Sequence, residues 1–279
     1  MLIFLNGQFV PEERAVVSVL DRSFLYGDGL FETMLVVKSK PFRWHDHLVR
    51  LQRGADFLKI KIPYSAETLR GFADELIAKN QMSHALLRLT LSRGVGARGY
   101  APIGADNPTL VMTLHPAPPA DTPPRWNLLT ASTRLPANEP LAQFKTCNKL
   151  PQILARIETA AAGADEALLL NTDGYVVEGS SSNLFWIEGD TICTPPLASG
   201  ILSGVTRAVV LEICQSLHLK TRESQIRPDQ LLPTDGVFVS LSSFGIVEAQ
   251  SLNGQSCKHS SFTAKISQAY RELIEKETA

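Results

Sequence analysis

Residues 140–154 read PLAQFKTCNKLPQIL and place one lysine, Lys145, between a proline-punctuated loop and the start of an apolar helix. The nearest lysine or arginine upstream of it is Arg134. Most lysines are solvated surface residues, so this position alone does not indicate chemistry. The apolar pattern from Lys149 onward predicts a helix with Pro151 in its first turn, where the missing N–H costs little.

The segments on either side of this stretch alternate between hairpin and helix patterns. The Asn6-Gly7 dipeptide favours the positive φ angles of a two-residue turn and predicts an amino-terminal hairpin. Apolar spacing predicts helices over 45–60, after a Ser65 cap, over 149–164, after 204 and over 261–276. Strands are predicted at 85–93, 109–115, 166–179 and 183–194. Such a mixture predicts an α/β (mixed α+β) fold with two layers in each domain.

The chain length and one proline-rich segment predict two domains. A chain of 279 residues exceeds the usual size of one domain. Residues 116–124 read PAPPADTPP, and five prolines in nine residues prevent helix and sheet pairing and favour a stiff connector. We therefore expect a smaller amino-terminal α/β domain over 1–118, a linker over 119–125 and a larger carboxyl-terminal domain over 126–279.

Composition argues against several classes of function. The net charge is -1, from 27 basic and 28 acidic residues, so no field for binding nucleic acid is expected. No segment predicts a signal peptide or a membrane span, which favours a cytoplasmic protein. The four cysteines are far apart, and no histidine spacing resembles a ligand set, so neither a disulfide framework nor a metal site is expected.

Three local features have the chemistry to hold a ligand. LSGVTR, residues 202–207, puts free amides at the start of a helix, where a phosphate would be favoured, although on this motif alone an ordinary serine-capped helix is the favoured interpretation. Arg50 could form a bidentate contact with phosphate, or face solvent on its helix. Glu178 ends a strand before SSSN, and would need a cationic or N–H partner if it is buried rather than exposed.

The order of these features resembles the class IV family of pyridoxal-phosphate aminotransferases, which is fold type IV. The motifs are DRSFLYGDGLFET at 21–33, HLVR at 47–50, the lysine at 145 with Asn148, EGSSSN at 178–183 and GVTR at 204–207. The family includes branched-chain and D-amino-acid transaminases and 4-amino-4-deoxychorismate lyase. The resemblance implies a two-domain enzyme with pyridoxal 5'-phosphate between the domains, an amino-acid-like substrate and a homodimer.

The resemblance also implies a role for each matching residue. Lys145 would be the catalytic lysine that forms a Schiff base with the cofactor, and Glu178 would keep the pyridine nitrogen protonated. The phosphate would be held by the remaining cofactor-binding residues, Arg50, Val205, Thr206 and Ser242. The family often has threonine at the position of Ser242, and the next residues, Ser243 to Gly245, depart from the transaminase pattern.

Residues expected near the substrate favour a lyase over a transaminase by a narrow margin. SRGVGARGY at 92–100 resembles the lyases, in which the second arginine, here Arg98, meets a substrate carboxylate; its glycines would allow that arginine to swing. Thr33 occupies a position where lyases keep threonine. Tyr26 and Ser243 would line the pocket in either case. In contrast, EGSSSNLF is very similar to D-amino-acid transaminases, which remain an alternative, and a branched-chain enzyme is less favoured.

Overall fold

The computed structural model describes residues 1–119 and 125–279, and these divide into two compact units. Unit 1 comprises Met1–Ala117, Phe144–Asn148 and Ile274–Ala279, and unit 2 comprises Pro118–Gln143 and Lys149–Leu273. The expected linker at 119–125 falls mainly on residues 120–124, outside the described residues, so the predicted domain limits stay a prediction. Lys145 belongs with unit 1 although it follows the proline-rich segment by about twenty residues.

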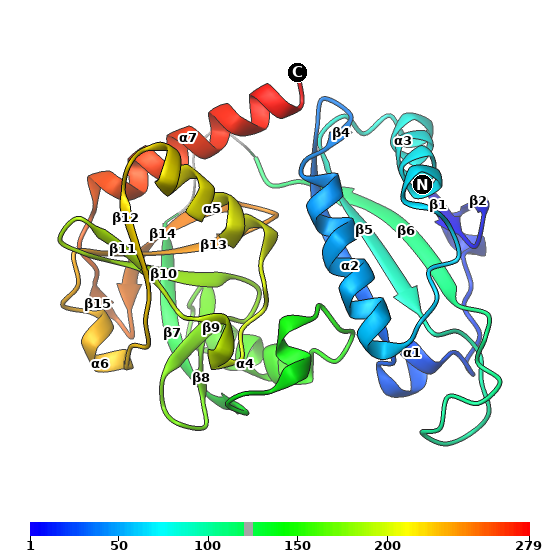
Figure 1. Cartoon of the computed structure of the whole chain (residues 1–279), viewed down its shortest axis with the longest axis horizontal. Helices are drawn as coiled ribbons and strands as arrows, with labels where there is room; N and C mark the ends of the chain where they lie inside the picture. The colour runs from blue at the N-terminus through cyan, green and yellow to red at the C-terminus, as the bar shows by residue number, and fades with distance from the viewer. Residues whose placement is uncertain (120–124) are drawn as a thin grey trace. The chain divides into compact units, whose positions relative to one another are not determined.

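Unit 1 is built on a six-stranded antiparallel sheet with the order β2-β1-β6-β5-β3-β4 (Figure 1). Its elements are β1 (Leu2–Leu5), β2 (Gln8–Pro11), the short helices η1 (Glu12–Arg14) and α1 (Arg22–Tyr26), β3 (Gly29–Val37), β4 (Lys40–Pro41), α2 (Trp44–Leu58), α3 (Ala66–Asn80), β5 (Ala85–Ser92) and β6 (Thr109–Pro116).

One face of this sheet is the hydrophobic core of unit 1. Alternate residues of β3, β5 and β6, such as Met34, Leu87 and Met112, are fully buried together with apolar residues of α2 and α3. Because side chains alternate along a strand, the intervening residues, including Phe31, Thr33 and Arg88, lie on the other face. One face of the sheet therefore packs in the hydrophobic core, and the opposite, more polar face carries Phe31, Thr33 and Arg88.

Unit 2 contains a nine-stranded sheet, most of whose strands form a closed ring. The path is β12-β11-β10-β13-β14-β7-β8-β9, and β9 also pairs with β10 through Glu178 and Asn183. Its elements are β7 (Trp126–Leu135), η2 (Pro140–Gln143), α4 (Leu150–Ala161), β8 (Glu166–Asn171), β9 (Val176–Gly179), β10 (Asn183–Glu188), β11 (Thr191–Thr194), η3 (Leu197–Ser199), α5 (Val205–Ser216), β12 (Lys220–Glu223), α6 (Pro228–Leu231), β13 (Gly236–Leu241), β14 (Gly245–Leu252), β15 (Gln255–Ser256) and α7 (Ser261–Glu277), which ends in unit 1.

The local predictions from sequence are largely confirmed. Asn6 and Gly7 have φ angles of 49° and 90° in the first hairpin turn, and the Ser65 side chain accepts a hydrogen bond from Thr68 N at 3.1 Å. Pro151 lies in the first turn of α4. Among the described residues, no helix is both long enough and apolar enough to cross a bilayer.

Candidate active site

Lys145 is held at the amino-terminal end of β3. Its carbonyl oxygen accepts a hydrogen bond from Phe31 N at 2.9 Å, and Cys147 N donates to Gly29 O at 2.9 Å. The Lys145 amine lies 4.7 Å from the centroid of the Phe31 ring. Backbone pairing therefore fixes the lysine on the face of the sheet that carries Phe31.

Behind this position, Glu32, His47 and Arg50 form a buried cluster. Arg50 donates from Nε to Glu32 Oε1 at 2.8 Å and from Nη2 to Oε2 at 2.5 Å, and His47 Nδ1 is 2.7 Å from Oε2. Burial raises the pKa of Glu32, but Arg50 and His47 outweigh it and lower that pKa to about 2. Burial also lowers the pKa of His47, so at neutral pH its Nδ1–H donates to an ionised Glu32. Glu32 thus fixes the position of Arg50.

Arg88 is a second cation beside Phe31. Its guanidinium carbon lies 3.9 Å from the ring centroid, and the residue pairs in register with Thr33 on β3. Burial lowers the pKa of Arg88. Over residues 1–119 and 125–279, Arg88 has no carboxylate partner. A partly desolvated guanidinium without a carboxylate is a suitable receptor for an anionic ligand group.

The loop that carries Arg98 is less free than its glycines predict. A Cβ on Gly94 would lie 1.9 Å from Asn107 O, and one on Gly96 would lie 2.9 Å from the Ala105 Cβ. Gly94 and Gly96 therefore permit close packing of this half of the loop, and the swing of Arg98 stays a prediction. Arg98 itself is exposed and makes no hydrogen bond or ion pair to the described chain.

In unit 2, Glu178 is buried at 9% exposure and accepts hydrogen bonds from nearby groups. Leu202 N donates to its Oε2 at 2.9 Å, and Asn183 Nδ2 lies 3.5 Å from the same oxygen. Asn183 Nδ2 also donates to Leu202 O at 3.0 Å. These contacts link the carboxylate at the end of β9 to the segment that leads into α5.

A second buried carboxylate, Glu166, holds the turn after Glu178. Its oxygens accept from the backbone N–H of Ser180 and from the hydroxyls of all three serines, with Ser181 Oγ at 2.8 Å and Ser182 Oγ at 3.2 Å. The exposed fraction of Glu166 is 1%. The serine run in EGSSSN is therefore explained by a local structural contact.

The remaining cofactor-binding candidates lie at two turns of unit 2. Val205 and Thr206 begin α5 after Gly204, whose lack of a side chain is required because a Cβ there would lie 1.9 Å from Asn183 Oδ1. The first amides of a helix have no intrahelical acceptor and favour an anion. Ser242 and Ser243 are half-buried in the turn between β13 and β14.

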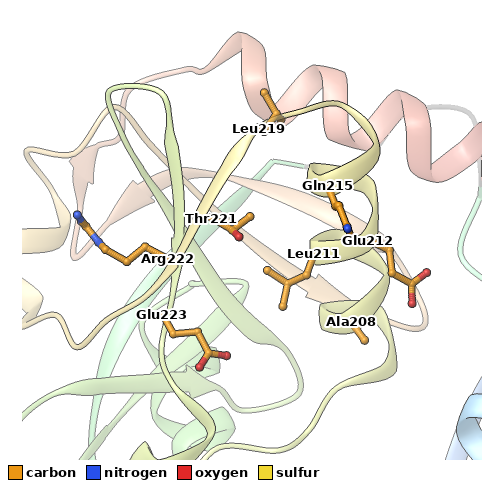
Figure 2. A pocket seen from close by; sticks show the side chains of 8 residues that line it. All are labelled: Ala208, Leu211, Glu212, Gln215, Leu219, Thr221, Arg222 and Glu223. Atoms are coloured by element: carbon orange, nitrogen blue, oxygen red, sulfur yellow. The ribbon is translucent and has the colours of Figure 1, made fainter.

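A groove of about 590 Å³ between α5 and β12 holds none of the residues predicted for the site (Figure 2). Its lining includes Leu211, Gln215 and Thr221, and Arg222 extends away from α5. The groove is lined by apolar, polar and charged side chains together, and they include no cluster of charges of one sign.

Sequence reasoning missed Glu32, Arg88 and Glu166. Each was readable as a charged residue within a strand pattern: Glu32 on the core face, Arg88 on the opposite face, and Glu166 at the start of a fully buried strand. A charge at such a position needs a partner or a function.

Comparison with known proteins resolves the family. The model for "Amino-transferase class IV" matches residues 29–252. The chain belongs to the class IV aminotransferases. It is 32% identical over 277 residues to a putative branched-chain-amino-acid aminotransferase of Methanocaldococcus jannaschii, covering 98% of this chain and 96% of the relative. It is 31% identical over 248 residues to aminodeoxychorismate lyase of Bacillus subtilis, covering 88% and 85%.

Among solved structures, the branched-chain aminotransferase of Thermoproteus uzoniensis with norvaline superposes with a TM-score of 0.93 at 29% identity, covering 99% of this chain and 96% of that one. The class IV aminotransferase fold of this chain is fold type IV, and enzymes of the class use pyridoxal 5'-phosphate; one similar branched-chain enzyme was solved with pyridoxamine 5'-phosphate. The donor set fits that cofactor: an amine at Lys145, a carboxylate at Glu178, and arginine and helix amides at Arg50, Val205 and Thr206.

Proposed function

We propose that this class IV enzyme acts on an amino substrate that carries carboxylate groups, with 4-amino-4-deoxychorismate lyase as the first candidate. The observation that carries the proposal is Arg88, a partly buried guanidinium that shares the Phe31 ring with Lys145. It has no carboxylate partner in the described chain, so it is suited to an acidic substrate group. Arg98 would supply a second cation, and aminodeoxychorismate has two carboxylates.

In this proposal Lys145 would hold the cofactor, and its amine, once the substrate amine has displaced it, would move a proton at the substrate Cα. Pyridoxal phosphate supplies a ring that accepts the electron pair left by that proton. Glu178 holds a proton on the ring nitrogen. The Leu202 amide keeps the Glu178 carboxylate in place.

The cofactor phosphate would be bound by Arg50, the Val205 and Thr206 amides and the Ser242 hydroxyl. Glu32 holds the Arg50 guanidinium in one orientation through two hydrogen bonds, which reduces the entropy that binding must overcome. Tyr26, Thr33 and Ser243 would contact the substrate. We also propose that the enzyme acts as a cytoplasmic homodimer.

The attachment residue is tested by borohydride reduction of the cofactor-loaded protein followed by peptide mapping. Lys145 should carry the label, because β3 fixes it beside Phe31 and Arg88. Lys149, four residues later, serves as the internal control. A label on Lys149 would exclude the proposed role of Lys145.

The reaction is tested by product analysis. Loaded enzyme given aminodeoxychorismate without a keto acid should release 4-aminobenzoate and pyruvate in equal amounts, since the elimination consumes no amino acceptor. Arg88→Met should raise the KM for this substrate roughly tenfold or more, the effect of losing a charge-assisted contact, and leave cofactor affinity unchanged.

A transaminase is the second candidate, because the relative from Methanocaldococcus jannaschii named as a putative branched-chain enzyme spans nearly the whole chain. It predicts keto-acid formation from D-alanine or L-leucine that requires 2-oxoglutarate. Such activity without pyruvate release from aminodeoxychorismate would replace the lyase proposal.

A further inference from the structure

The loop that carries Arg98 is attached to α1 by one buried arginine, Arg22. Arg22, which is 3% exposed, donates from Nη1 to Gly99 O at 2.9 Å and to Ala101 O at 3.4 Å. Its Nη2 donates to Tyr100 O at 2.9 Å. Three consecutive carbonyl oxygens directly after Arg98 are therefore bound by one guanidinium.

Further contacts support the same attachment. Gly99 N donates to the Tyr26 hydroxyl at 3.2 Å, and the Arg22 guanidinium lies 5.1 Å from the Tyr26 ring centroid. A Cβ on Gly96 would lie 3.1 Å from Arg22 Cδ, so the loop backbone also packs directly on the arginine stem.

The arginine is itself held in place. Its Nε donates to Asp28 Oδ2 at 2.8 Å, and Arg93 donates to both oxygens of the same carboxylate. Burial works against ionisation of Asp28, but Arg93 and Arg22 outweigh it and hold the pKa of Asp28 below its usual value. Asp28 is thus charged at neutral pH, and it fixes the planar fork of Arg22 toward the loop.

We infer that Arg22 is a positioning residue, which orders the loop so that the exposed Arg98 is presented in one place to a carboxylate of the substrate. The inference rests on the proposed role of Arg98 in substrate binding. A loop ordered before substrate arrives does not lose its conformational freedom on binding, so affinity for the acidic substrate depends on a residue that does not touch it.

Arg22→Lys is the test variant, because lysine keeps a cation beside Asp28 but cannot bind three carbonyls in a fork. Arg93→Lys is the matched control: Arg93 shares Asp28 but donates its other bonds to Leu58 O and Lys59 O, outside the loop. Gly96→Ala is a second variant, which disturbs the packing of the loop against Ala105 and Arg22 without removing any charged group.

Hydrogen–deuterium exchange of the Gly99 amide, which donates to the Tyr26 hydroxyl, measures the order of this loop with no substrate present. Exchange should be at least about tenfold faster in Arg22→Lys and Gly96→Ala than in wild type, and unchanged in Arg93→Lys, because only the first two release the loop. Unchanged exchange in both loop variants would overturn the inference, whatever their activity.

Steady-state kinetics separate this inference from the proposed function. Arg22→Lys should raise the KM for the acidic substrate about fivefold or more with kcat little changed, and should add nothing in an Arg98→Ala background. A KM that Arg98→Ala leaves unchanged would contradict the proposed function. Two outcomes would overturn the role of Arg22 and leave the proposed function standing. In the first, Arg98→Ala raises the KM and Arg22→Lys does not. In the second, both variants raise the KM and their effects add independently in the double variant.

Discussion

At the scale of single residues, the most deeply buried carboxylates of the site each have specific partners. Glu32 is the clearest case, since its carboxylate is 1% exposed and contacts both Arg50 and His47. An unpaired carboxylate at this position would strongly disfavour folding. The lowered pKa of Glu32 therefore has a measurable consequence for stability.

The stability contribution of Glu32 should depend on pH in the acid range. Its folded pKa of about 2 lies below the ordinary 4.5, so the contribution is complete above about pH 4.5 and is lost as the pH falls toward 2. The shift corresponds to about 3 kcal/mol. Urea denaturation from about pH 7 to 2.5 should show this loss in wild type, and Glu32→Gln should abolish that part of the pH dependence. Parallel pH profiles for the two proteins would contradict the assignment.

Sequence motifs pointed to some of the candidate residues and not to others. Lys145, Glu178 and Arg50 were named because each belongs to a short motif whose order along the chain is typical of the family. Arg22 and Arg88 were missed because their roles arise from contacts across long sequence separations, such as Arg22 with the carbonyls of residues 99–101. The place of Arg88 in a strand pattern marks it as a charge that needs a partner or a function, but no local pattern indicates which distant group an arginine contacts.

At the scale of elements, local patterns were sufficient for helices and hairpins and insufficient for strand pairing. The Asn6-Gly7 turn, the Ser65 cap and the first-turn proline of α4 are local rules, and all three are present. Strand pairing depends on contacts between segments that are apart in the sequence. Examples are the pairing of β9 with β10, which closes the ring, and the parallel pairing of β7 with β8 and β14. No periodicity in the sequence encodes them.

The turn between β9 and β10 provides a prediction at this scale. Glu166→Ala should lower the free energy of unfolding by roughly 1–3 kcal/mol, because it removes the acceptor of three serine hydroxyls at a buried site. It should also speed cofactor dissociation, since this turn joins Glu178 to Asn183. Denaturation and dialysis rates measure the two effects. Glu75→Ala is the control, because Glu75 pairs with Lys79 on the exposed surface of α3 and should change stability by less than about 0.5 kcal/mol. A Glu166 variant as stable as this control would contradict the role of the carboxylate.

At the scale of the whole molecule, an exposed apolar segment predicts how two copies of the chain associate. Val16, Val19, Leu20, Phe24 and Leu25 are each between 44% and 76% exposed within ten residues of sequence. The Arg98 loop continues this surface, because Tyr100 is 86% exposed and its ring lies 5.6 Å from that of Tyr26 in α1. Large exposed apolar side chains that gather in one short segment are typical of an interface. We expect a homodimer, because a two-fold axis lets one patch bury itself against its copy.

Phe24→Glu should therefore convert the dimer to a monomer in analytical ultracentrifugation, because a charge at the centre of the patch cannot be buried without a partner. Leu217→Glu, at the end of α5 and 36% exposed, is the matched control and should leave the dimer intact. If the wild-type protein is a monomer, or if the Phe24→Glu variant is still a dimer, this surface is not the dimer interface.

If the dimer forms through this surface, Arg98 of one chain would complete the substrate site of the other, and two impaired variants should restore each other at low substrate concentration. Lys145→Ala lacks the catalytic amine, and Arg98→Ala lacks the carboxylate contact, so it turns over little substrate at concentrations far below its raised KM. In a mixed dimer with shared sites, one site carries both lesions and the other carries neither, so exchange of subunits should return about one quarter of wild-type activity when dimers form at random from equal amounts. When Phe24→Glu is added to both variants, activity should not recover, because the chains stay monomeric and no mixed dimer forms. Proven exchange without recovery would mean that Arg98 acts within its own chain, and the loop held by Arg22 would then serve the site of the same subunit.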